Sequence, residues 1–263
     1  MSLHFRGKVA IVTGGAAGIG QALCEALSRH GARVIVADID EERGRQTASA
    51  IAANGGLARA AHLDVTNREH VQRLVADTAG EFGHLDYMFN NAALTASRGE
   101  LCDLPCEAWL RAIDVNFLGV LYGTMAAYAC MIRQGSGHIV NTASLAGLVG
   151  FPTSMPYGAT KAAVVNLSMS LRMEAAARGI KVSVTCPGPV HADTDQHRRL
   201  IGVGKAARQI LTGVERNRAI IVFPWLARLL WWRYRLSPEL VLPLGRKLVR
   251  SYRAEQLAER ESS

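Results

Sequence analysis

A tyrosine and a lysine stand four residues apart in the segment YGATK, at Tyr157 and Lys161. On a helix, residues four apart project from one face, so the two side chains meet. A phenol has a reference pKa of about 10 and is a poor base at neutral pH, but a nearby ammonium favours the phenolate and lowers that pKa. The pair therefore predicts proton transfer, with Tyr157 as general acid or base and Lys161 tuning it.

A second group of residues suits a phosphate-containing ligand. The apolar run KVAIVT leads into TGGAAGIGQALCEAL, in which Gly14, Gly18 and Gly20 surround the start of a helix. Glycines permit a tight turn and let a pyrophosphate approach the free amides and positive end of a helix. The next β-branched run, RVIVAD, ends at Asp38, where a carboxylate would accept hydrogen bonds from an adenosine ribose. This combination predicts a dinucleotide site.

Charge at this site bears on which dinucleotide binds. Asp38 would repel a 2′-phosphate, and Ala17 in the loop offers no positive charge to hold one, so the sequence favours NAD(H) over NADP(H). A purely structural alternative is that Asp38 caps the helix that begins near Glu41.

The elements that must position these residues alternate regularly. Seven strand-like runs are separated by longer stretches rich in Ala, Leu, Arg and Glu: KVAIVT, RVIVAD, LARAAHLDV, LDYMFNNA, GHIVNTAS, IKVSVTCP and AIIVFP. Nearly continuous apolar runs such as VAIV are typical of buried parallel strands with helices on both faces. We therefore predict a single-domain α/β fold with a doubly wound parallel sheet. Residues 1–223 would form the catalytic domain and residues 224–263 a helical extension.

The alternation of strand-like and helix-like runs is interrupted by one irregular segment, which we predict to be a substrate loop at about residues 188–215. Within it, HADTDQH would place His191, Asp193, Asp195 and His197 on one face if extended, and such a set could hold a divalent metal. The pair Cys102 and Cys106 is a weaker metal candidate because no second pair completes four ligands. A polar lid without metal is the favoured interpretation.

Further short motifs follow in order along the chain. They are NNAA at 90–93, DVNFLG at 114–119, NTAS at 141–144, YGATK at 157–161 and CPGPV at 186–190. Together with the Gly-xxx-Gly-x-Gly spacing, this set resembles the short-chain dehydrogenase/reductase family over residues 7–223. The resemblance implies a Rossmann domain with a seven-stranded parallel sheet. It also implies which residues contact the cofactor. The turn beside the cofactor would be formed by Gly14, Gly18, Ile19 and Gly20, the adenosine ribose would be held by Asp38, and the adenine would be bordered by Asp64 and Val65. The middle of the cofactor would be lined by Asn91 and Ala92, and its nicotinamide end would be met by Pro187, Gly188 and Val190.

The same resemblance suggests roles for four catalytic residues. Tyr157 would be the acid that reduces a ketone or the base that oxidises a secondary alcohol, and Lys161 would also hold the nicotinamide ribose. Ser144 would position the reacting oxygen, and Asn116 would support a chain of waters leading toward Lys161. Two positions depart from the family pattern. Ala93 replaces a frequent Gly, and Ala192 stands where a Thr usually grips the carboxamide, a role that Thr194 could take.

Composition and charge also bear on nucleic-acid binding and on the compartment in which the protein works. The net charge is +8, and residues 198–253 carry thirteen Lys or Arg against two Glu. A solvated basic face is the favoured interpretation, and we predict no nucleic-acid partner. The N-terminus does not resemble a secretory signal, and five scattered cysteines do not form a disulfide framework, so we expect a cytoplasmic protein with reduced thiols.

The C-terminal stretch PWLARLLWWRYRLSP predicts a helix from Trp225 to Leu236. One face would carry Trp225, Leu229, Trp232 and Leu236. The stretch is too short and too rich in arginine to span a membrane, but it could lie at a membrane surface, line the pocket or contact another subunit. We rank pocket or subunit contact first. Ser237 and Pro238 indicate a second helix, interrupted at Pro243 and Gly245.

Taken together, these patterns predict an NAD(H)-dependent oxidoreductase that interconverts a secondary alcohol and a ketone. Apolar C-terminal residues, and the lack of an obvious anion-binding cluster near the catalytic residues, favour a bulky apolar substrate of steroid-like, terpenoid, aromatic or fatty type. The alternative is a catalytically silent protein that senses a dinucleotide or docks on a membrane. Long helices near 105–133 and 156–178 would pair between subunits, as the resemblance implies, in a homodimer or homotetramer.

Overall fold

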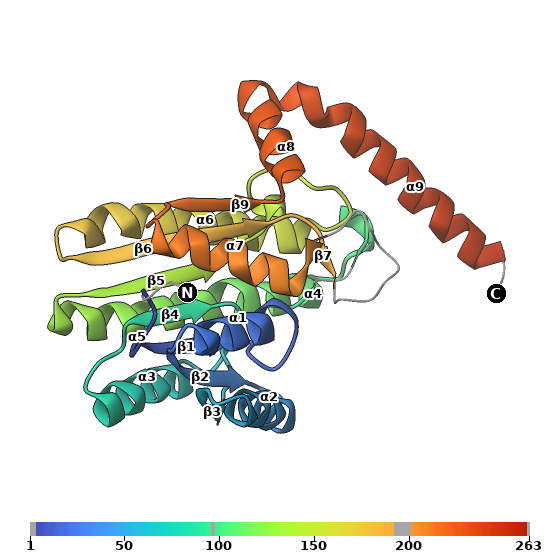
Figure 1. The fold of residues 1–263 in the computed structure, drawn as a ribbon. Helices are drawn as coiled ribbons and strands as arrows, with labels where there is room; N and C mark the ends of the chain where they lie inside the picture. Colours follow the sequence, from blue (N-terminus) through green and yellow to red (C-terminus); the bar gives the residue numbers. More distant parts are fainter. Residues whose placement is uncertain (1–3, 96–97, 192–200, 262–263) are drawn as a thin grey trace.

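A seven-stranded parallel sheet forms the centre of the computed structural model, which describes residues 4–95, 98–191 and 201–261 (Figure 1). The strand order is β3-β2-β1-β4-β5-β6-β9. The bounds are β1 (Val9–Thr13), β2 (Arg33–Asp38), β3 (Leu57–His62), β4 (Tyr87–Asn90), β5 (Gly137–Thr142), β6 (Ile180–Pro187) and β9 (Ile220–Phe223). All seven predicted strands are confirmed. The chain reverses its direction of travel through the sheet between β1 and β4, where open α/β sheets bind ligands beyond the strand ends.

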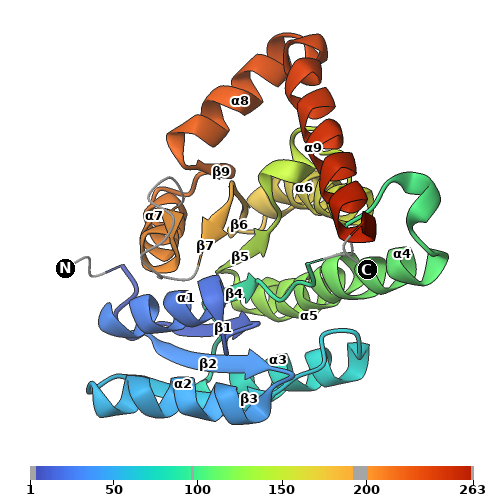
Figure 2. The ribbon, with the colours of Figure 1, turned by 90° about the vertical axis from the view of Figure 1, so that its right-hand side faces the viewer.

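Helices cover both faces of the sheet, as predicted (Figure 2). One face carries α1 (Gly18–Arg29), α2 (Glu41–Ala53) and α7 (Val203–Glu215). The other carries α3 (Arg68–Phe82), α5 (Gly119–Gln134) and α6 (Met155–Ala176). α4 (Cys106–Ile113) continues through a π-helical turn, η2 (Asp114–Leu118), into α5, and two short 3₁₀ turns are η1 (Leu101–Asp103) and η3 (Leu145–Gly147). Burial from both sides explains why the strands are almost continuously apolar.

The predicted substrate loop is shorter than expected. The prediction of a loop is wrong for residues 203–215, which form α7. The apolar side chains of α7 pack against α1. The buried residues Ala206, Ala207, Ile210, Leu211 and Val214 recur at helical spacing. Before α7, the short strands β7 (Val190–His191) and β8 (Ile201–Gly202) pair in parallel.

Several residues singled out in the sequence lie outside the described residues. These are Ala192, Asp193, Thr194, Asp195 and His197. The proposed carboxamide contact of Thr194 therefore stays a prediction. Among the residues that the structure describes, no three His, Cys, Asp or Glu side chains cluster as a metal site would require.

Two further helices project from the end of β9. The predicted helix Trp225–Leu236 is confirmed as α8, and a 3₁₀ turn, η4 (Pro238–Val241), leads into α9 (Leu242–Glu261). The predicted interruption at Pro243 and Gly245 is wrong, since α9 runs through both positions. Pro243 stands in the first turn, where a helix needs no backbone N–H donor. In Figures 1 and 2, α8 leads away from the sheet and α9 returns toward the segment before α4.

The tryptophans of α8 divide between two faces. Trp231 packs with Leu230 and Tyr234 against a core cluster below the helix. The predicted face of Trp225, Leu229, Trp232 and Leu236 is exposed, each side chain by 48% or more. Within one chain, only Trp231 of the three therefore packs against the body of the protein.

One helix in the described part of the chain, Cys106–Gln134, is long and apolar enough by length and composition to cross a membrane. Its buried residues Ala127, Cys130 and Met131 belong to the core between α3, α5 and the sheet. Such a pattern is typical of a core helix in a parallel α/β fold.

Candidate active site

The glycine loop joins β1 to α1 with almost no room for side chains. Gly14 and Gly18 have φ of +67° and +55°, which other residues rarely adopt. A Cβ atom on Gly14 would lie 2.8 Å from the Cα of Ala92, and one on Gly20 would lie 1.9 Å from the carbonyl oxygen of Gly14. The three predicted glycines therefore bring the backbone of the loop, the start of α1 and the end of β4 close together.

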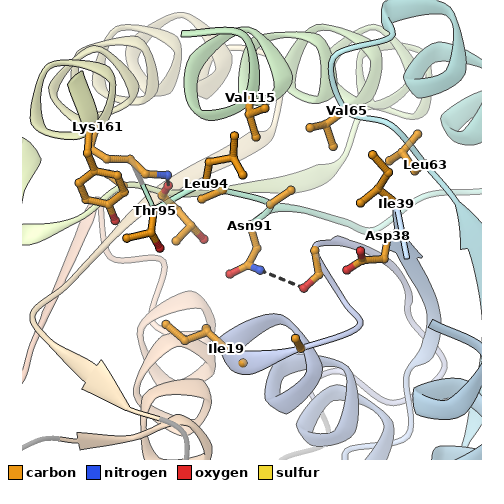
Figure 3. Close-up of a pocket in the computed structure, with 18 of the residues that line it drawn as sticks. Ile19, Asp38, Ile39, Leu63, Val65, Asn91, Leu94, Thr95, Val115 and Lys161 are labelled. Carbon is orange, nitrogen blue, oxygen red and sulfur yellow. Dashed lines mark hydrogen bonds between the residues drawn. The ribbon is translucent and has the colours of Figure 1, made fainter. Parts of the chain in front are cut away.

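Thr13 and Asn91 connect this loop to β4. The Thr13 Oγ1 atom accepts the backbone N–H groups of Asn91 at 2.9 Å and Ala92 at 3.0 Å. The side-chain amide of Asn91 donates to the carbonyl oxygen of Thr13 at 3.1 Å. It also donates to that of Gly14 at 3.4 Å, the dashed line at Asn91 in Figure 3. Asn91 lines the cavity, while Thr13 is a positioning residue that the sequence motifs did not single out.

Asp38 lies at the carboxyl end of β2, beside the same loop. One carboxylate oxygen accepts the backbone N–H of Ala16 at 2.9 Å and the other that of Asp40 at 3.0 Å. The helix α2 is capped by Asp40, whose side chain accepts the N–H of Arg43 at 3.0 Å. The alternative that Asp38 is the cap of α2 is therefore wrong, and its carboxylate lines the cavity instead.

A cavity of about 670 Å³ extends along the carboxyl ends of the strands, from Asp38 to Tyr157 (Figure 3). This volume is in the usual range for cofactor sites. It brings together most of the predicted residues: Gly14, Gly18, Ile19, Asp38, Asp64, Val65, Asn91, Ala92, Tyr157, Lys161 and Pro187. Gly20, Asn116, Ser144, Gly188 and Val190 do not line it. Sequence reasoning missed some apolar and polar lining residues, among them Ile39, Leu63, Leu94, Thr95 and Thr142.

At the adenine border, Asp64 has a structural task that the sequence motif did not indicate. Its carboxylate accepts hydrogen bonds from the hydroxyl of Thr66 at 2.7 Å and its backbone N–H at 2.9 Å. These bonds lower the pKa of Asp64 and hold the turn after β3 beside the cavity.

Lys161 is completely buried, and its Nζ atom donates to the carbonyl oxygen of Thr142 at 2.9 Å. The same Nζ lies 5.6 Å from the centroid of the Tyr157 ring. Burial lowers the pKa of Lys161 from 10.5 to about 8. The structure therefore brings the two residues together as their spacing predicts.

The expectation that the Lys161 ammonium lowers the pKa of Tyr157 is wrong for this structure. Burial raises the pKa of Tyr157, and a hydrogen bond with the Ser144 side chain opposes that rise. The physical reason is that removal from water disfavours the phenolate more than its neighbours favour it. Tyr157 is thus a protonated phenol at neutral pH.

Ser144 follows β5 and caps η3, where its Oγ atom accepts the backbone N–H of Ala146 at 3.2 Å. That bond holds the hydroxyl at the strand end, next to Tyr157. Cys186, at the end of β6, is also buried here, and burial raises the pKa of its thiol to about 12. Cys186 is therefore a neutral packing group beside Lys161, which sequence reasoning did not place in the site.

Asn116 is buried in the π-helical turn η2. Its Oδ1 accepts the backbone N–H of Leu94 at 2.7 Å, and its Nδ2 donates to the Leu94 carbonyl at 3.0 Å. The side chain therefore fixes the segment after β4, which lines the cavity at Leu94 and Thr95. Each amide group keeps one further hydrogen-bonding position, and the predicted support of a water chain by Asn116 stays a prediction.

Comparison with known proteins agrees with this geometry. Residues 8–200 match the short-chain dehydrogenase family. The chain is 35% identical over 202 residues to 2-(S)-hydroxypropyl-CoM dehydrogenase 3 of Xanthobacter autotrophicus, which covers 77% of this chain and 78% of that protein. It is 40% identical over 185 residues to 2,5-dichloro-2,5-cyclohexadiene-1,4-diol dehydrogenase of Sphingobium indicum, covering 70% and 73% of the two chains.

Solved structures show the same architecture. The apo form of LigD from Sphingobium sp. strain SYK-6 matches with a TM-score of 0.81 and 29% identity, over 89% of this chain and 96% of that one. A short-chain dehydrogenase/reductase from Burkholderia phymatum, solved in complex with NAD, matches with a TM-score of 0.77 and 28% identity, over 83% and 89%. By its sequence, its fold and the residues at its cavity, the chain belongs to the short-chain dehydrogenase family, whose members are oxidoreductases that bind a nicotinamide dinucleotide.

Proposed function

We propose that the protein is an NAD(H)-dependent oxidoreductase that interconverts a secondary alcohol and a ketone on a bulky, apolar substrate. The observation that carries this proposal is the position of Tyr157 and the buried Lys161 in one cavity with Asp38 and the glycine loop. The same cavity thus offers a dinucleotide site and a proton-transfer pair.

The cavity fits a dinucleotide because the loop has backbone where side chains would obstruct it. Gly14 and Gly18 line it, and the start of α1 lies behind them. The carboxylate of Asp38 would accept the ribose hydroxyls at the far end and repel a 2′-phosphate, which supports NAD(H) over NADP(H). When bound, the nicotinamide would accept or supply the hydride.

The side chains at the other end of the cavity handle the proton. Tyr157, protonated at neutral pH, would donate its proton to the oxygen of a ketone and become a phenolate. In the reverse direction that phenolate would take the proton from an alcohol. Ser144 orients that oxygen by a hydrogen bond. Lys161, fixed by Thr142, would bind the ribose next to the nicotinamide. Two relatives carry names of dehydrogenases of hydroxyl-bearing compounds, which supports an alcohol as the reacting group.

We also propose that the chain acts in the cytoplasm as a homodimer or homotetramer, without a nucleic-acid partner. Leu110, Met125 and Met173, on α4, α5 and α6, are exposed by 55%, 48% and 74%. Large apolar side chains that stay exposed on such helices are typical of a subunit interface. Light scattering of the purified protein tests this proposal, and a monomer would contradict it.

The function is tested by following NADH absorbance with NAD and a panel of apolar secondary alcohols. Tyr157→Phe should reduce turnover by a factor of about 10³ or more while NAD binding persists, because the acid/base group is lost. Tyr128→Phe, on α5 away from the cavity, is the matched control and should keep its activity. Tight NAD binding without turnover across the panel would instead support a silent, dinucleotide-sensing protein.

A further inference from the structure

A second cavity, of about 650 Å³, lies between the C-terminal extension and the segment that leads into α6. The body of the protein contributes Phe151, Pro152 and Met155. The extension contributes the end of α8, its 3₁₀ turn and part of α9, with lining residues Tyr234, Pro238, Val241, Leu242 and Val249. The walls are therefore mostly hydrocarbon, as in sites for apolar ligands.

The two cavities share no lining residue, but both are lined from the first turn of α6. Met155 begins α6 and stands two residues before Tyr157, which lines the first cavity. A molecule whose reacting oxygen reached Tyr157 could therefore extend its remaining carbon skeleton past Met155 and under α9. The family match ends at residue 200, so the side of the cavity formed by the C-terminal extension is built by residues outside the matched region.

The extension is attached to the body at both ends of the cavity. Near α8, Leu230, Trp231 and Tyr234 pack against the core. In the middle of α9, the Nε and Nη2 atoms of Arg253 donate to the Glu100 carboxylate, at 2.6 and 2.7 Å. The guanidinium of Arg98 also lies 5.6 Å from the centroid of the Tyr252 ring. These contacts hold α9 in place over the cavity.

Three arginines of α9 line this otherwise apolar cavity: Arg246, Arg250 and Arg253. Their spacing of four and three residues places them on one helix face. Arg253 is neutralised by Glu100. Within the described parts of the chain, Arg246 and Arg250 have neither an ion pair nor a side-chain hydrogen bond, and like charges four apart on a helix destabilise it.

We propose that Arg246 and Arg250 bind an anionic group at the end of the substrate, whose apolar body fills this second cavity. The substrate class would then be an amphipathic secondary alcohol or ketone with a carboxylate, sulfonate or phosphate. Guanidinium groups match these anions by paired hydrogen bonds. The inference rests on the proposed function for the reacting end of the substrate, while the anion-binding end is independent of turnover.

Binding measurements test this subsite without any need for catalysis. Dodecanoate and methyl dodecanoate, both below the concentration at which they aggregate, would be titrated calorimetrically into the NAD-loaded protein. We expect dodecanoate to bind more tightly than its ester. The double variant Arg246→Gln/Arg250→Gln should weaken dodecanoate binding by about tenfold and that of the ester by less than about twofold, since a charged hydrogen bond is lost only in the first case.

The matched control is Arg233→Gln/Lys247→Gln, which removes the same charge from the extension at residues that do not line the cavity. Equal weakening by both double variants, or equal affinity for acid and ester, would overturn the proposal. So would a charge effect seen only with vesicles that contain phosphatidylglycerol, because that result assigns the arginines to a lipid surface.

Activity measurements separate this inference from the function on which it rests. If 11-hydroxydodecanoate is oxidised with a KM that rises about tenfold in Arg246→Gln/Arg250→Gln, at unchanged kcat, both proposals are supported. Oxidation of its methyl ester with no dependence on these arginines would overturn the subsite alone. Arginine-dependent dodecanoate binding in a protein that oxidises no alcohol would support the subsite and contradict the proposed function.

Discussion

The Nζ atom of Lys161 lies 5.6 Å from the centroid of the Tyr157 ring and donates to the Thr142 carbonyl oxygen at 2.9 Å. The ammonium is thus held by strand β5, beside the phenol rather than bonded to it. Because both groups are buried, each is shifted toward its neutral form, with the pKa of Tyr157 raised and that of Lys161 lowered to about 8.

The two directions of the reaction should therefore depend differently on pH. Burial holds the pKa of Tyr157 above its ordinary value of 10.0, so the acid needed for ketone reduction is fully present at neutral pH. We expect kcat/KM for reduction to be level between about pH 6 and 8, and kcat/KM for oxidation to rise throughout this range and beyond. Lys161 titrates in the same region, so the rise belongs to the coupled pair. An oxidation rate already level at pH 7 would contradict a raised pKa.

Asp38 should decide between the two dinucleotides. In Asp38→Asn the repulsion of a 2′-phosphate is lost, and we expect the preference for NAD over NADP, measured as a ratio of kcat/KM, to fall by about tenfold or more. Asp40→Asn is the control because asparagine caps helices as well as aspartate does, so α2 should stay intact. An unchanged ratio in Asp38→Asn would remove the charge argument for NAD.

Gly20 should tolerate no side chain. Because its Cβ would lie 1.9 Å from the Gly14 carbonyl oxygen, Gly20→Ala must displace the loop or α1. We expect a loss of about 1–3 kcal/mol in the free energy of unfolding and greatly weakened NAD binding, measured by urea unfolding and calorimetry. Gly80→Ala, in α3 with no atom within 4 Å of the added Cβ, should be neutral or stabilising. Normal NAD binding by Gly20→Ala would show that the loop has other room.

The contact between Glu100 and Arg253 should matter for large substrates only. Glu100→Gln removes one charge of the pair that holds α9, so we expect KM for a bulky apolar alcohol to rise by roughly two- to fivefold, a size typical of exposed ion pairs. KM for 2-propanol and for NAD should not change. Glu107→Gln, exposed on α4, serves as the control. An equal effect on 2-propanol would mean that the variant disturbs the catalytic residues.

His138 should make the fold sensitive to acid. Burial lowers its pKa to about 3, and its Nε2 lies 2.9 Å from the Ser183 hydroxyl. Above about pH 6.5, which is the pKa of a histidine in the unfolded chain, His138 is neutral in both the folded and the unfolded protein, so it does not lower the free energy of unfolding. As the pH falls from there toward 3, only the unfolded chain takes up the proton, so the free energy of unfolding decreases.

At pH 4.5 this loss should amount to about 3 kcal/mol relative to pH 7.5, in addition to the contribution of carboxylates. His138→Gln keeps a donor for Ser183 and should lose less stability than the wild type over the same interval, as urea unfolding at both pH values would show. His62→Gln, at an exposed position, should behave like the wild type. A wild-type-like loss in His138→Gln would exclude this histidine as the cause.

Much of the fold and the cofactor site could be predicted from short stretches of sequence. Strands buried on both faces need nearly continuous apolar residues, so the inner strands were visible locally, while the edge strand β3 is only partly buried and was visible by its place in the alternation. Gly14, Gly18 and Asp38 were also predictable, because a positive φ favours glycine and the strand end beside the loop favours an acidic residue. The task of Asn116 was not, since its partner Leu94 lies far away in the sequence and no local pattern records that contact.

The sequence by itself determined the family, the order of the elements and which tyrosine and lysine meet on one helix, because these depend on residue types at short, fixed spacings. Only the tertiary structure decided the protonation of that pair, since burial is the sum of contacts from many distant residues. It also decided which residues line the second cavity. The sequence shows no anion-binding cluster near Tyr157, but α8 and η4 turn the chain back so that Arg246 and Arg250 face the cavity beside Met155.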